Sequence, residues 1–151
     1  MVFDEEADSQ SVEIVFGLGS KLSAEVECPV LAVLNHDDDI LMYGLFEDGK
    51  LTDHYNAAPD YFDPDGELAK PAGGDAARLA AAFGSNNGEL IEDILRKTSY
   101  DESGYIFAIE RHADLAKALG LPDVWVNLGF NYLSQGELPP GLSQEDLTRV
   151  G

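Results

Sequence analysis

The chain has 151 residues, of which 44% are hydrophobic, and 29 acidic side chains against nine basic ones give it a formal net charge of −20. This length fits one domain, and the hydrophobic content excludes a disordered acidic tail. A surface this negative repels phosphate backbones and anionic lipid headgroups, which argues against nucleic-acid and membrane-surface binding. The expected partner is therefore a basic protein or a cationic ligand. The oligomeric state stays open.

The single cysteine, Cys28, permits no intramolecular disulfide, and its place in an alternating apolar run predicts a small buried thiol. Residues 1–10 are acidic and lack a basic, apolar leader, which predicts a flexible arm and a cytoplasmic protein. The longest apolar run, 30–34, is far shorter than the roughly 20 residues that span a bilayer. Residues 11–151 are expected to form a single domain.

The first half of the domain has the composition of β-strands. Residues 12–16 are rich in β-branched and aromatic side chains and precede a glycine-containing turn, and 25–34 alternate in polarity. A third apolar run, 40–46, ends at Asp48-Gly49, a dipeptide favoured in two-residue hairpins. The second and third of these runs and the strand after the hairpin form a meander. A two-residue turn sets the cross-strand pairs Glu47 with Lys50, Phe46 with Leu51, Tyr43 with His54, and Met42 with Tyr55.

Helices are expected to dominate after a long surface loop at 57–74. Asp75 and Asn87 are placed to cap helices at 76–83 and 88–97, each of which carries an apolar stripe. A short buried strand at 105–109 and a helix at 111–119 follow.

The last part of the chain alternates over 124–132, which predicts a further strand, and Ser143 with Asp146 has the spacing of a capping box. The order of elements predicts an α+β fold. The sheet is mostly antiparallel, with about five or six strands, and three or four short helices pack on one face of it.

Acidic turns offer a possible cation site. Asp37, Asp38 and Asp39 follow His36 directly, and Asp63 and Asp65 lie in the later loop. Calcium and magnesium prefer carboxylate oxygen ligands, so a divalent cation is one interpretation. Consecutive side chains point in different directions, however, and aspartate is a common turn residue. An ordinary turn is the favoured interpretation.

Two sets of side chains could bind a small ligand. Trp125, Asn127 and Asn131 share one face of the predicted last strand, an aromatic platform with amide groups. Tyr43 and His54 face each other across the predicted hairpin. The competing interpretation of the Trp125 row is a sheet face half covered by helices, with amides at its wet margin, and it is favoured.

No stretch of the chain carries a motif that assigns it to a family, and its three histidines lack the local signature of a nucleophilic site. The leading hypothesis is a non-enzymatic, acidic interaction module that binds a basic partner. One alternative is a small calcium- or magnesium-dependent enzyme or ligand-binding domain. Another is that the acidity reflects a salt-adapted proteome and is unrelated to function.

Overall fold

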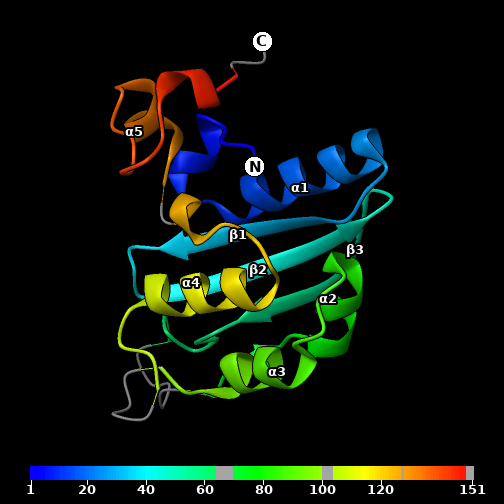
Figure 1. Cartoon of the computed structure of the whole chain (residues 1–151). Coiled ribbons are helices and arrows are strands. Elements are labelled where there is room, and N and C mark those ends of the chain that lie inside the picture. Colours follow the sequence, from blue (N-terminus) through cyan, green and yellow to red (C-terminus); the bar gives the residue numbers. More distant parts are fainter. Residues whose placement is uncertain (64–69, 100–103, 127, 149–151) are drawn as a thin grey trace.

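A computed structural model describes residues 1–63, 70–99, 104–126 and 128–148 of the chain, which fold as one α+β domain. Within these residues the sheet has four antiparallel strands in the order β1-β2-β3-β4 (Figure 1). Their bounds are Val30–His36 (β1), Ile40–Glu47 (β2), Lys50–Asn56 (β3) and Ala72–Gly73 (β4). The prediction of five or six strands was therefore slightly high.

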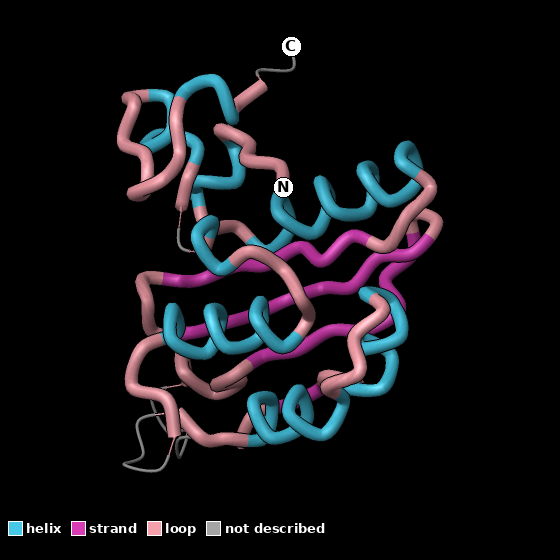
Figure 2. Tube along the Cα trace, in the orientation of Figure 1, coloured by secondary structure: helices cyan, strands magenta, loops and turns pink. Residues whose placement is uncertain are grey.

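Helices outnumber the prediction among the described residues (Figure 2). The α-helices are α1 (Val12–Val26), α2 (Ala76–Phe83), α3 (Gly88–Arg96), α4 (Ala108–Ala118) and α5 (Phe130–Ser134). Three short 3-10 helices add η1 (Glu6–Ser9), η2 (Asp123–Trp125) and η3 (Gln144–Asp146). Among the described residues, no helix is both long and apolar enough to cross a membrane.

The central meander β1–β2–β3 confirms the hairpin prediction near its turn. Glu47 pairs with Lys50 across the two-residue turn, as expected. A bulge between Leu45 and Phe46 then leaves Thr52 as an extra residue on β3. Consequently the predicted partners further along are shifted by one position: the pairs are Tyr43 with Tyr55, Gly44 with His54, and Met42 with Asn56.

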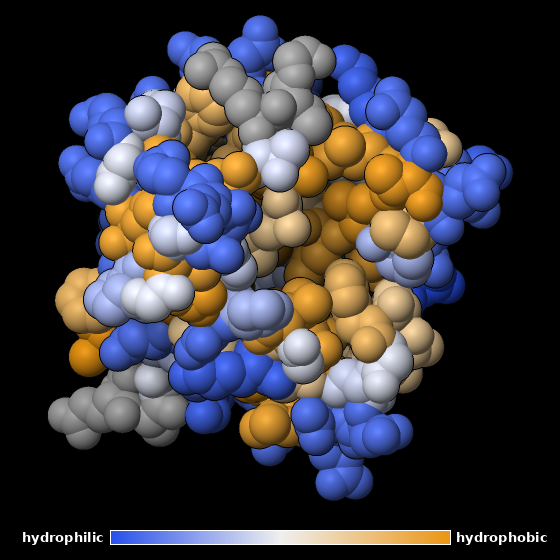
Figure 3. Space-filling view, turned by 45° about the horizontal axis from the view of Figure 1, so that its top comes forward, coloured by the Kyte–Doolittle hydropathy of each residue, from blue (hydrophilic) through white to orange (hydrophobic). Residues whose placement is uncertain are grey.

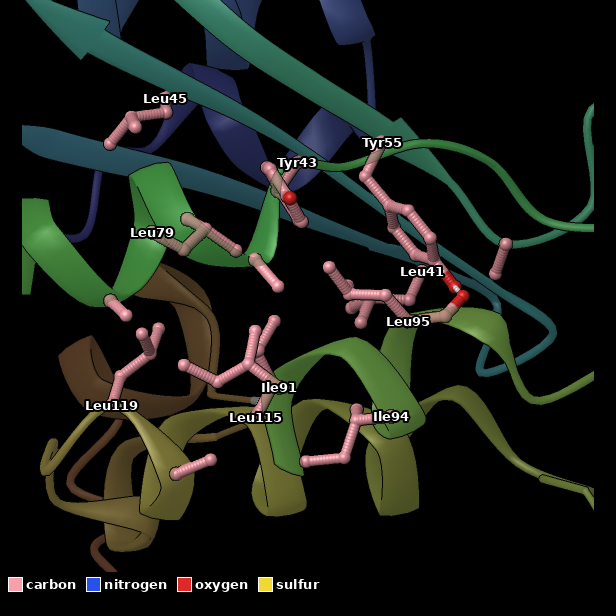
Figure 4. Packing of buried hydrophobic residues seen from close by; sticks show 14 of the residues in the cluster. Leu41, Tyr43, Leu45, Tyr55, Leu79, Ile91, Ile94, Leu95, Leu115 and Leu119 are labelled. Atoms are coloured by element: carbon pink, nitrogen blue, oxygen red, sulfur yellow. Dashed lines mark hydrogen bonds between the residues drawn. The ribbon is translucent and has the colours of Figure 1, made fainter. Parts of the chain in front are cut away.

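The helices cover both faces of the sheet, which corrects the expectation of one covered face. On one face, α1 packs Val15 against Ala32, Leu34 and Phe46. On the other face, a larger cluster joins the sheet to α2, α3 and α4 (Figure 4). Its largest fully buried apolar members are Tyr43, Tyr55, Leu41, Leu45, Leu79, Ile91, Leu95 and Leu115.

Residues 12–16 and the glycine-containing segment after them belong to α1, so the predicted strand and turn were wrong. The buried positions Val15, Gly19 and Ser23 are four residues apart, the spacing of one helix face. A Cβ on Gly19 would lie 2.7 Å from the Cβ of Ala32. The glycine therefore lets the helix approach the sheet closely, and this packing overrides the local β propensity.

The two later strand predictions were also wrong. Tyr105 makes only an isolated bridge to Ser99, and α4 begins at Ala108. The alternating run 124–132 contains parts of η2 and α5, apart from residue 127, which lies outside the described residues. Cys28 is exposed beyond the end of α1, which corrects the expected buried thiol.

The helix-end predictions were more accurate because caps are local. Asp75 caps α2 by accepting a hydrogen bond from the Arg78 N–H at 2.9 Å, and Gly84 ends the helix with φ of 65°. Asn87 stands at the start of α3, but its amide donates to the Ala118 carbonyl instead of capping. The Ser143–Asp146 capping box is present at η3.

Candidate functional site

A cleft of about 650 Å³ lies where the amino-terminal segment, the β1–β2 turn and the carboxyl-terminal segment meet. The amino-terminal segment lies beside α5 in this part of the fold (Figure 1). The lining residues come from all three segments: Gln10, Asn35, Asp37, Asp38, Val124, Val126, Leu128, Tyr132, Glu137, Leu138 and Pro139. Segments more than 100 residues apart in sequence therefore build one concave surface.

The cleft combines apolar walls with a few polar groups. Val124, Val126, Leu128 and Leu138 supply aliphatic surface, and the carboxylates of Asp37, Asp38 and Glu137 supply negative charge. Ligand sites typically have this composition and volumes of about 300–1,000 Å³. Aliphatic walls with carboxylates suit a ligand with an apolar body and a cationic group. Figure 3 shows one face of the molecule, on which hydrophobic surface lies among hydrophilic side chains.

The β1–β2 turn fixes the acidic edge of the cleft. Asp37 and Asp38 adopt positive φ values of 50° and 63°, and the Asp39 N–H donates to the His36 carbonyl at 2.9 Å. Aspartate tolerates this left-handed conformation better than most residues, which explains why the turn is built from it. The Asp37 side chain is 70% exposed, and its Oδ2 lies 3.8 Å from Nε2 of His36.

Asp38 connects this turn to α4. Its Oδ1 accepts a hydrogen bond from the Ile109 N–H at 2.7 Å, and its carbonyl accepts one from the Ala108 N–H at 2.9 Å. These are amide groups of the first turn of α4, which have no partner within the helix. Asp38 is thus a helix cap supplied from 70 residues earlier in the chain, and its carboxylate is already engaged.

The amino-terminal segment holds the other side of the cleft in place. The Asp8 carboxylate accepts hydrogen bonds from the N–H groups of Phe130 and Asn131, at 2.9 and 2.8 Å, at the start of α5. Gln10 Oε1 accepts a hydrogen bond from the Asp37 N–H at 3.2 Å. Two side chains of the predicted arm therefore hydrogen-bond to opposite sides of the cleft, Asp8 to α5 and Gln10 to the β1–β2 turn.

The predicted ligand-binding residues lie in different elements. Trp125 lies in η2, with its ring centroid 6.0 Å from that of Phe3, and Asn131 is exposed in α5. Asn127 lies outside the described residues. Tyr43 is buried beneath the helices, where its hydroxyl donates to Asp53 at 2.8 Å, whereas His54 is exposed on the opposite face of the sheet. The hairpin pair therefore does not form one site.

The predicted metal ligands have other contacts. Asp39 accepts a hydrogen bond from the Tyr61 hydroxyl at 2.7 Å, which raises the pKa of that phenol. The Asp63 N–H donates a hydrogen bond to the Asp60 carbonyl at 3.0 Å and so closes a short turn. Asp65 lies outside the described residues. In the part of the chain that the structure describes, no group of three or more histidine, cysteine or acidic side chains is arranged to hold a metal ion.

Among the described residues, Arg111 is the most deeply buried charged side chain, and the sequence interpretation did not single it out. Its guanidinium donates to the Tyr55 hydroxyl at 2.8 Å and to the carbonyls of Ile94 and Lys97 at 2.7 and 2.8 Å. It lies over the Tyr105 ring at 4.6 Å. Burial lowers the pKa of this group. Arg111 thus joins α4 to the carboxyl end of α3 and belongs to the core, apart from the cleft.

A signal for Arg111 existed in the sequence, since it continues the buried helical stripe that also contains Ala108, Leu115 and Ala118. Asp8 and Gln10 had no comparable signal, because their partners are distant in sequence.

Comparison with known proteins adds no relative: no family model, curated protein or solved structure matches the chain. The function must therefore be inferred from the cleft itself.

Proposed function

We propose that this protein is a non-enzymatic interaction module that binds a basic partner through the cleft. The observation that carries the proposal is the cleft's composition: aliphatic walls with the carboxylates of Asp37, Asp38 and Glu137, and no lysine or arginine among the described residues that line it. An arginine or lysine side chain matches this surface, since its methylene stem is apolar and its head is cationic. The chain's charge of −20 would also accelerate the encounter with such a partner.

The proposal can be tested with a fluorescent nine-residue peptide in which arginine and serine alternate. We expect binding at 50 mM KCl that weakens at least about tenfold at 300 mM, because salt screens the attraction. Affinity that does not depend on salt, or the absence of binding at 50 mM, would contradict the proposal.

A pair of charge-matched variants separates the cleft from net charge. Asp37→Asn/Glu137→Gln removes two cleft charges, and Glu25→Gln/Glu27→Gln removes two exposed charges at the far end of α1. We expect the cleft variant to weaken binding about tenfold and the control to change it less than about twofold. Equal losses would mean that the peptide senses only the overall field, as expected if the acidity were a salt adaptation.

A further inference from the structure

Exposed aromatic and aliphatic side chains lie around the β1–β2 turn, which also lines the cleft. We call this group the aromatic patch, and it consists of Tyr61, Phe62, Ile106 and Phe107. These side chains are large and hydrophobic, yet their residues are 38%, 66%, 57% and 53% exposed, respectively. Single exposed hydrophobic residues are common on proteins, whereas grouped ones mark interaction surfaces.

Contacts with the β1–β2 turn place both parts of the patch around it. The Phe62 ring lies 5.4 Å from the His36 ring and 5.0 Å from the Tyr61 ring, and the Tyr61 hydroxyl binds Asp39. On the other side, Asp38 binds the first amide groups of α4, which follow Phe107 directly. The turn and the start of α4 lie side by side at the same end of the sheet (Figure 1).

The position of Phe107 is unusual for a residue with a folding role. It occupies the N-cap of α4, where serine, threonine, aspartate and asparagine are strongly preferred. Asp38 supplies the carboxylate cap from the turn, so the N-cap residue itself is free to carry an aromatic side chain. That side chain is more than half exposed and is thus available to a partner.

Charge decides which occupant fits this surface. Exposed carboxylates stand in the turn (Asp37) and in the two segments that carry the patch (Asp60 and Glu110). A second copy of this chain would bring a further charge of −20 to an acidic surface, which disfavours self-association. A partner segment that mixes basic with aromatic or aliphatic side chains satisfies both the carboxylates and the apolar surface.

From this placement we infer that the aromatic patch is the docking surface for hydrophobic side chains of the basic partner, so that the turn lies at the centre of one continuous interface. This inference rests on the proposed function and adds the partner's chemistry. The partner is a protein segment whose basic residues face the cleft and turn and whose apolar residues cover Phe62 and Phe107.

Two peptides of equal charge test the inference: one alternates arginine with leucine, and the other alternates arginine with serine. We expect the wild-type protein to bind the arginine–leucine peptide at least about tenfold more tightly. Phe62→Ala/Phe107→Ala should abolish this preference and leave affinity for the arginine–serine peptide unchanged. Leu90→Ala/Val26→Ala is the control, since it truncates two similarly exposed residues away from the turn and should keep the preference.

Far-UV circular dichroism and the urea midpoint establish that each variant is folded, and Phe62→Ala alone, at the most exposed ring of the patch, serves if the double variant is unstable. Absence of a preference in the wild-type protein, or its survival in the patch variant, would overturn the inference. The proposed function would still stand if both peptides bound with steep salt dependence. If neither peptide bound at 50 mM KCl, both proposals would fail.

Discussion

The two faces of the sheet are stabilised in different ways. Beneath α2, α3 and α4, large side chains fill a broad core that also contains a buried arginine and hydrogen-bonded tyrosines. Beneath α1, the core is small, and neighbouring side chains pack tightly against the backbone at Gly19 and Gly44. A Cβ on Gly44 would lie 2.8 Å from the Phe46 ring.

This difference predicts different sensitivities to mutation. The broad core should be most vulnerable to loss of buried atoms and hydrogen-bond donors, because cavities and unpaired polar groups are costly. The α1 face should be most vulnerable to added atoms. The β1–β2 turn belongs to neither core, and its Asp38 connects the sheet to α4.

The largest effect is expected at Arg111. Arg111→Met keeps much of the apolar stem but removes the donors to the Tyr55 hydroxyl and to the carbonyls at the end of α3. We expect the free energy of unfolding to fall by about 3–5 kcal/mol, as for a broken buried polar network. Urea denaturation measures it. Lys117→Met, at a side chain with 60% exposure on the same helix, is the control and should cost less than about 0.5 kcal/mol. A loss below 1 kcal/mol at Arg111 would show that the α3–α4 junction is held by apolar packing alone.

The next effect concerns His112 of α4, whose Nδ1 has no hydrogen-bond partner among the described residues. Burial lowers the pKa of His112 to about 4, from an ordinary value of 6.5. The unfolded chain therefore takes up a proton at a higher pH than the folded chain. The contribution of neutral His112 to the free energy of unfolding is therefore present above pH 6.5. It is lost as the pH falls toward 4, and the total loss is roughly 3 kcal/mol.

His112→Gln isolates this effect from the protonation of the many carboxylates. Between pH 7 and pH 5.5, the free energy of unfolding of the wild type should fall by about 1–2 kcal/mol more than that of the variant. Parallel curves across this range would show that His112 titrates normally and is reached by water.

The two faces also differ in how far their sequences predict them. The strands β2 and β3, the cap at Asp75 and the stripes of α2 and α3 follow local rules, since each signal lies within one element. In α1 the β-branched residues 12–16 favour a strand locally, and only contact with Ala32 and Phe46 explains a helix with glycine at position 19. The cleft itself was not predicted, since Asp37 and Asp38 were considered only as part of a possible cation site. Their meeting with the 124–138 segment depends on Asp8 and Gln10, whose partners no local pattern specifies.

Gly19 tests the close approach of α1 to the sheet. Gly19→Ala places a methyl group 2.7 Å from Ala32 Cβ and 2.9 Å from the Phe46 ring, so we expect a loss of about 1–3 kcal/mol by overpacking. Gly17→Ala is the matched control in the same helix, because its Cβ would meet no atom within 4 Å. It should stabilise the protein by about 0.5–1 kcal/mol through helix propensity. Equal changes at both positions would mean that α1 can move away from the sheet without cost.

The smallest effect is expected at the turn, where Asp38 and Asp37 form a matched pair. Both have positive φ, so replacement by glycine relieves similar backbone strain at each position. Only Asp38 caps α4, and Asp38→Gly should therefore lower the free energy of unfolding by about 1 kcal/mol more than Asp37→Gly. Hydrogen exchange should locate the loss at the first amides of α4, Ala108 and Ile109. The Ile109 N–H loses the Asp38 carboxylate that accepts its hydrogen bond, and the neighbouring bond from the Ala108 N–H to the Asp38 carbonyl is weakened with it. If both variants were equally stable, α4 would not need the turn. The position of Phe107 beside the acidic residues would then need another explanation, since a cap from Asp38 is what allows an aromatic residue to begin this helix.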